Sequence, residues 1–237
     1  MDRTIMQITL RGLFGRRRFL LLLPLPVLVV GLAALTSGYG VAAVDWAPAV
    51  LGGLGLAVLL PVVALVVGTG VLGSEIDDGT VLHILTKPLP RSTIVFSKLA
   101  VAVGVTFVSV AVPLFVTGMM AASVRLGLAL VVGAAAGAVA YCSLFVALSL
   151  LTRRPVLLGL VYVLVLEGLL GGFAPRTRML SIQQYCLTLV DAIAPTDLVE
   201  GHVGVGLSVV MTLVFLVVGG WLAVDRLRSY RVTGETS

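Results

Sequence analysis

The sequence predicts an all-α integral membrane protein with six membrane-spanning helices, and two observations support this fold class. The first is composition: 59% of the 237 residues are hydrophobic and 11% are charged, whereas a soluble domain carries about 25% charged residues. The second is patterning, because the apolar residues gather into six runs, each near the roughly 20 residues that a helix needs to cross a bilayer. A mean hydropathy of +1.16 is too high for a domain whose surface must face water.

The positive charges predict the orientation of these spans. The six predicted spans are residues 19–37, 47–73, 99–123, 126–152, 155–173 and 204–224. All but three of the 16 lysines and arginines fall in segments on one side; the exceptions are Arg125, Arg176 and Arg178. The positive-inside rule then places both termini and residues 74–98 in the cytoplasm, and residues 174–203 outside. We treat residues 1–237 as one transmembrane domain, whose net charge of +5 reflects topology and anionic lipid rather than nucleic acid.

Residues 1–18 predict an amphipathic helix that lies in the inner membrane interface. The apolar residues that share one helical face are Met6, Leu10, Leu13 and Phe14. Polar residues lie opposite and arginines follow, which is typical of an interfacial helix. An alternative is an export signal, because residues 16–21 read RRRFLL and a basic start before an apolar run also begins a signal peptide. Five further spans and the lack of a clean small-residue cleavage site favour a retained helix.

Residues 74–98 form the longest polar interval of the chain. Within it, residues 80–86 predict a short helix, called the stub below, with apolar side chains on one side. These side chains are Val81, Leu82 and Leu85. The prolines of residues 87–91 end the stub because they remove donors and restrict the preceding residues, and a new helix starts at Ser92 and carries Lys98 into span three. Apolar side chains presented to the cytoplasm indicate that another protein covers them.

The stretch EIDDGTVLHILTKPLPRSTIVFSKL, residues 75–99, resembles the intracellular coupling segment of type-2 ABC transporter permeases. That segment has an acid, a Gly-Thr pair, a short apolar stub, a proline, an arginine and a lysine just before span three. EGLLGGFAPRTRMLSIQQY, residues 167–185, is similar to the fifth span and outer loop of small bacterial members, so the resemblance covers essentially the whole chain. The ATPase-coupling residues that it implies by position are Glu75, Asp78, Gly79, Thr80, Leu82, Leu85, Pro88, Arg91 and Lys98. For the charged ones, loop solvation and topology signalling remain an alternative.

The resemblance implies the permease half of an ATP-driven ABC transporter, an exporter, in the plasma membrane of a bacterium. Two copies of a P-loop ATPase would bind ATP and Mg and would hold the stub. A second permease copy, identical or related, would complete the pair among the membrane lipids. This chain has no G-x-x-x-x-G-K-S/T loop, the sequence that holds nucleotide phosphates, so we expect no cofactor and no enzyme activity in it. The alternative is a non-ATP membrane protein, either a secondary transporter subunit or a scaffold of a membrane complex.

Glu167 is a carboxylate inside predicted span five. At the rise of an α-helix it lies about 18 Å from Pro155, just past the midplane. A charge at that depth costs about 2.5–3.5 kcal/mol on insertion scales, so we expect the side chain to face protein or a wet cavity. Two interpretations remain open. Glu167 contacts substrate or acts as a gate along the transport path, or it forms a structural hydrogen bond with a neighbouring helix or the outer loop.

The outer loop contains a second amphipathic segment, residues 181–193. One face carries Ile182, Tyr185, Cys186, Leu189 and Ile193. We predict a short helix at the outer surface, which is either a lid packed on spans five and six or an outer gate. In span four, Gly133 and Gly137 form a small-xxx-small step that lets helices approach closely, either within one subunit or between subunits.

A catalytic or metal site is not predicted. The DDG triplet of residues 77–79 occurs in lipid head-group transferases, but the second acidic repeat of those enzymes is missing. His83 and His202 fall on opposite sides of the membrane, and the two cysteines are isolated, so no zinc pattern can be formed. We expect Cys142 and Cys186 to be packing residues.

Overall fold

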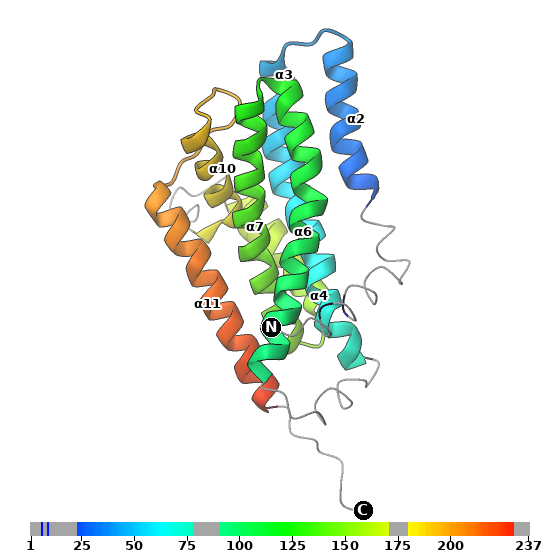
Figure 1. Ribbon diagram of the computed structural model, residues 1–237, viewed down its shortest axis with the longest axis vertical. Helices are drawn as coiled ribbons and strands as arrows, with labels where there is room; N and C mark the ends of the chain where they lie inside the picture. The colour runs from blue at the N-terminus through cyan, green and yellow to red at the C-terminus, as the bar shows by residue number, and fades with distance from the viewer. Residues whose placement is uncertain (1–5, 7–8, 10–22, 78–90, 171–179, 230–237) are drawn as a thin grey trace, which may run out of the picture.

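The computed structural model describes residues 6, 9, 23–77, 91–170 and 180–229, and these form a bundle of long helices (Figure 1). The elements are α2 (Pro24–Gly38), α3 (Ala43–Ala47), η2 (Pro48–Leu59), α4 (Leu60–Asp77), α6 (Arg91–Ala121), α7 (Val124–Leu151), α8 (Pro155–Val161), η3 (Tyr162–Leu170), α10 (Ile182–Ile193) and α11 (Val205–Ser229). Apart from one isolated bridge between Thr196 and Val199, the regular structure of the described residues is helical. The predicted all-α class is therefore confirmed.

Four helical stretches are long and apolar enough to cross a membrane, and they coincide with predicted spans two, three, four and six. They are Ala43–Val71, Ser92–Ala121, Val124–Leu151 and Val205–Leu227. Two shorter apolar helices, Pro24–Gly38 and Pro155–Gly168, lie at predicted spans one and five, and their crossing of the bilayer stays a prediction. The predicted stub and, apart from Met6 and Thr9, the predicted interface helix lie outside the described residues.

The long helices run in alternating directions, so their connections gather at two ends of the bundle (Figure 1). α4 ends at Asp77 and α6 begins at Arg91 at the same end, which we call the inner end because the positive-inside prediction assigns it to the cytoplasm. The short connection from α6 to α7 lies at the outer end. There the side chain of Ser123 accepts a hydrogen bond from the N–H of Leu126 at 3.3 Å, and this N-cap starts α7.

Two apolar helices contain π-helical segments. η2 forms the outer part of span two, and η3 forms the second half of the helix at span five. A π-helix closes its hydrogen bonds between residues five apart. Such helices are rare in proteins, and those that occur often lie at functional sites. Composition does not predict this winding, because both segments are uninterrupted apolar runs except for Glu167.

α7 is the central helix of the bundle. It packs against α4, α6, α8, α10 and α11, and most of its residues are buried. Glycine permits the closest approach: a Cβ on Gly219 of α11 would lie 2.7 Å from the carbonyl oxygen of Ser143 on α7. These five helices are therefore positioned relative to α7.

Candidate functional site

The structure describes both flanks of the predicted coupling segment. Glu75 lies near the end of α4, and Arg91 is the first residue of α6. The coupling residues between them lie outside the described residues: Asp78, Gly79, Thr80, Leu82, Leu85 and Pro88. Lys98, the last residue of the segment, has a described side chain.

Lys98 joins the two helices that flank the coupling segment. It is 1% exposed, and its ammonium group donates a hydrogen bond to the carbonyl oxygen of Val71 on α4 at 3.2 Å. A buried ammonium group is costly unless polar partners replace its water. The contact therefore favours one relative position of α4 and α6 near the inner end.

Glu167 joins three helices through one carboxylate. The residue is 7% exposed. Its Oε2 accepts a hydrogen bond from the Tyr141 hydroxyl on α7, and its Oε1 accepts the backbone N–H groups of Ile182 at 2.9 Å and Gln183 at 3.4 Å on α10. These contacts agree with the structural interpretation of Glu167, namely hydrogen bonds to a neighbouring helix and to the outer segment. A role in the substrate path or as a gate stays a prediction.

The Glu167 contacts close the N-terminus of α10. The first N–H groups of a helix have no acceptor within the helix. Glu167 accepts the first two, and the side chain of the N-cap residue Ser181 accepts the third from Gln184 at 3.4 Å. A carboxylate also suits the positive end of the helix dipole. α10 is thus capped by a side chain of another helix as well as by its own N-cap.

The C-terminus of α10 has the complementary contact. Arg125, near the start of α7, donates from Nε to the carbonyl oxygen of Ile193, the last residue of α10, at 2.7 Å. A cation suits the negative end of a helix dipole. The two ends of α10 therefore face opposite charges, an acid on η3 and a base on α7.

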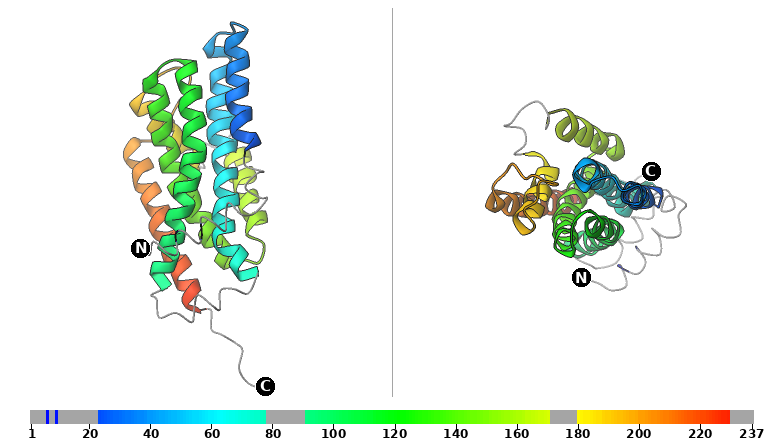
Figure 2. Two further views of the ribbon diagram at one scale, coloured as in Figure 1. Left: turned by 45° about the vertical axis from the view of Figure 1, so that its right-hand side comes forward. Right: turned by 90° about the horizontal axis from the view of Figure 1, so that it is seen from above.

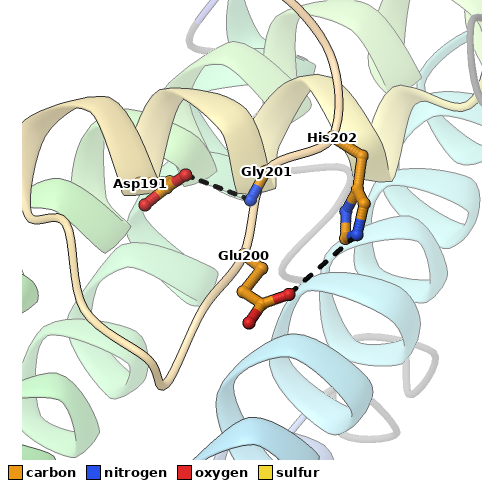
Figure 3. Close-up of polar contacts among 4 residues, drawn as sticks. All are labelled: Asp191, Glu200, Gly201 and His202. Atoms are coloured by element: carbon orange, nitrogen blue, oxygen red, sulfur yellow. Dashed lines mark hydrogen bonds and ion pairs between the residues drawn. The ribbon is translucent and has the colours of Figure 1, made fainter.

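The chain after α10 folds back onto it, as Figure 3 shows. The N–H of Gly201 donates to Asp191 Oδ2 at 3.3 Å, which fastens this loop to α10. Nearby, Nε2 of His202 lies 4.0 Å from Oε2 of Glu200, and both side chains are exposed to solvent. An exposed pair of this kind contributes little to stability.

Two glycines of α7 form the seat of α10, a name we use for Gly133 and Gly137. A Cβ on Gly137 would lie 2.8 Å from Cys186 Sγ, and a Cβ on Gly133 would lie 3.2 Å from the Cys186 carbonyl oxygen. Burial raises the pKa of the Cys186 thiol above its ordinary value. Within this chain, the small-xxx-small step of span four thus serves packing inside one subunit.

α10 lies deeper in the bundle than the sequence predicts. We expected a helix at the outer surface, with one buried face. Its ends are instead connected to α7 at two distant points, directly at Arg125 and through Glu167 at Tyr141. These two residues are about 24 Å apart along α7 at the rise of an α-helix. Gln183 Nε2 also donates to the carbonyl oxygen of Gly52 in η2 at 3.3 Å. The buried residues of α10 are Ile182, Tyr185, Cys186, Leu187, Thr188 and Val190. They surround much of the helix because α7, α11 and η2 all pack on it.

Sequence reasoning found Glu167 but missed its partners. Tyr141 lies in the apolar run of predicted span four. Its hydroxyl group, which can pair with a buried acid, is the feature of the sequence that could have suggested it as a partner of Glu167. Arg125 was counted only as an exception to the charge rule. In the parts of the chain that the structure describes, no three His, Cys, Asp or Glu side chains are grouped so that they could hold a metal.

Apolar spans around a central helix, with two buried charges that join them, define a multi-pass helical membrane protein. A family model described as ABC-2 family transporter protein matches residues 4–222. The chain belongs to this family, so the resemblance to ABC transporter permeases is confirmed. No curated protein matches the chain.

Proposed function

We propose that this protein is the permease subunit of an ATP-driven ABC exporter and that residues 74–98 couple it to a separate ATPase. The family match over residues 4–222 carries the proposal. The coupling role of the segment and the export direction follow from the resemblance. We propose the bacterial plasma membrane as its location, with both termini in the cytoplasm, because the basic residues concentrate on that side.

The contact between Lys98 and Val71 supports a mechanical role for the segment. It fixes α4 and α6 to each other, and these are the helices that precede and follow the stub in the sequence, so a force on the stub would move both helices together. Both helices pack against α7, and a helix transmits displacement along its length. In this mechanism the apolar stub binds a groove on the ATPase, and the neighbouring acidic and basic residues orient it.

The partners in this proposal are two P-loop ATPase subunits, which bind ATP and Mg, and a second permease copy. ATP hydrolysis takes place in the ATPase subunits, because this chain has no P-loop sequence to hold nucleotide phosphates.

Co-purification tests the proposal. The tagged protein, extracted in mild detergent, should retain a P-loop ATPase encoded by the same cell. Leu82→Asp and Leu85→Asp should leave membrane insertion intact and remove the ATPase, because a charge on the apolar side of the stub opposes docking. His83→Asp is the matched control, since helical spacing places His83 on the other side of the stub.

Two results contradict the proposal. One is a wild-type protein that retains no ATPase under conditions in which it stays monodisperse. The other is retention by Leu82→Asp and Leu85→Asp at the level of His83→Asp. The first result favours a non-ATP membrane protein, and the second moves the ATPase contact away from the stub.

A further inference from the structure

The helix at span five is the least embedded of those that contact α10. Among residues 155–168, only Gly159 and Glu167 are buried, and Leu164 is 58% exposed. A Cβ on Gly159 would lie 3.0 Å from Cε1 of Phe145 on α7, so the helix approaches the bundle closely at that point. Viewed from above, the yellow-green helix stands at the edge of the bundle (Figure 2). Few packed side chains therefore oppose a tilt of this helix about Gly159.

The two end contacts of α10 differ in what they connect. Arg125 belongs to α7, the helix on which α10 is seated, so this contact joins two elements that already pack together. Glu167 belongs to η3, so its contact joins α10 to the helix at span five. The hydroxyl of Tyr162 on η3 also donates to the carbonyl oxygen of Leu180, just before α10, at 3.1 Å. A tilt of span five relative to α7 would therefore stretch the hydrogen bonds at the Glu167 end of α10 and leave the hydrogen bond at the Arg125 end unchanged.

The Glu167 contact is strong enough to hold the helix and can still be broken. Oε1 of Glu167 accepts two backbone N–H groups of α10 and Oε2 accepts the Tyr141 hydroxyl, so three hydrogen bonds must break before the carboxyl group can leave. Once the carboxylate leaves, two N–H groups of α10 lose their acceptor inside the bundle, which is unfavourable without water. The position of α10 on its seat thus differs from a released position by a few specific hydrogen bonds, which hold α10 in place until they break.

We propose that Glu167 and Arg125 are positioning residues that hold α10 on its seat by hydrogen bonds at its two ends, and that transport releases the Glu167 end when span five moves. The first half concerns this chain alone. The second half rests on the proposed function, because it requires an ATPase to drive the movement. The two halves are tested separately.

Cys186 is a natural reporter of the seated position. Its thiol is buried against Gly137, so it reacts only when α10 leaves α7. The other cysteine, Cys142, is buried within α7, with Thr106 Oγ1 at 3.3 Å from its Sγ. Labelling of Cys142 therefore reports loss of the bundle itself. Cys142→Ala and Cys186→Ala backgrounds isolate the two signals.

The first experiment measures the labelling rate of Cys186 with a small, membrane-impermeant thiol reagent in liposomes, without an ATPase. Glu167→Gln and Arg125→Gln should each raise this rate about tenfold, which corresponds to about 1.4 kcal/mol. Arg125→Lys should retain most of the protection. Glu200→Gln, an exposed acid beyond α10, is the matched control and should leave the rate unchanged.

Faster labelling of Cys186 with Cys142 still protected supports the two positioning residues. Unchanged labelling of Cys186 overturns them, and so does equal acceleration of both cysteines, since that shows a general loss of packing.

The second experiment uses the assembled transporter with its ATPase and repeats the labelling during ATP turnover. Cys186 should then react about tenfold faster than in the resting complex, with Cys142 unchanged. An unchanged rate during measured ATP hydrolysis overturns the release step and leaves the proposed function intact. Conversely, failure to assemble any ATPase contradicts the proposed function. The first experiment, which needs no ATPase, still tests whether Glu167 and Arg125 hold α10 on its seat.

Discussion

Gly137→Ala tests whether the close approach of α10 to α7 is needed for stability. The added Cβ would lie 2.8 Å from Cys186 Sγ and would also meet the side chain of Leu60 on α4. Overpacking of this kind costs about 1–3 kcal/mol. Against this, replacing glycine by alanine within a helix gains about 0.5–1 kcal/mol. The net expectation is a loss of about 0.5–2 kcal/mol in the free energy of unfolding.

Gly104→Ala in α6 is the matched control, because nothing lies within 4 Å of the Cβ that it adds. It should stabilise the protein by about 0.5–1 kcal/mol, so the two variants should shift in opposite directions. Thermal unfolding in detergent micelles, followed by circular dichroism at 222 nm, measures both. If Gly137→Ala is as stable as Gly104→Ala, α10 does not occupy the seat, and the reasoning built on it fails.

Three further changes probe the polar contacts. Ser181→Ala should cost about 1 kcal/mol in the same unfolding assay, because Gln184 loses its N-cap acceptor; no change would mean that Glu167 alone caps α10. Glu200→Gln should change stability by less than about 1 kcal/mol, since its pair with His202 is exposed, and a larger loss would refute that assessment. Lys98→Met should leave the ATPase bound but return the rate of Cys186 labelling during turnover to the resting rate, whereas Lys98→Arg should keep the faster rate. A fast rate in Lys98→Met would contradict the proposed role of the contact between Lys98 and Val71.

Spans two, three, four and six were predictable because hydrophobic length is a local property. Residues 126–152 were predicted as span four, and the structure has Val124–Leu151. Residues 155–173 were predicted as span five; the structure describes an apolar helix at Pro155–Gly168, and residues 171–173 lie outside the described residues. The π-helical hydrogen bonding of η3 could not be predicted, because a hydrophobic run indicates burial in lipid and does not indicate the hydrogen-bond pattern within the helix.

The contacts of the candidate site were not predictable because they join residues far apart in the chain. Tyr141 is 26 positions from Glu167, and Gly52 is 131 positions from Gln183. A single sequence could show that Glu167 needs a partner, since a carboxylate in a span is costly. It could not show which of several hydroxyl and amide groups supplies one.

The amphipathic pattern of α10 predicted a helix correctly and its surroundings incorrectly. Leu189 and Ile193 were expected on the buried face, but both are only partly buried, whereas Leu187 and Val190 are buried. An amphipathic pattern assumes one apolar side and one wet side. A half-length helix inserted between α7, α11 and η2 has neighbours on several sides, so a single apolar face does not describe it.

Among the charged residues whose side-chain burial the structure describes, Lys98 and Glu167 are the buried ones. Lys98 fixes α4 to α6 near the inner end, and Glu167 fixes η3 to α7 and α10. α4 and α6 both pack on α7, so a displacement that begins at Lys98 reaches Glu167 through one continuous helix. The two residues then act in series, and their effects should not add. During turnover Lys98→Met should slow Cys186 labelling, Glu167→Gln should keep it fast in every state, and the double variant should match Glu167→Gln. An intermediate rate in the double variant would show that the two contacts act independently and that α7 does not connect them.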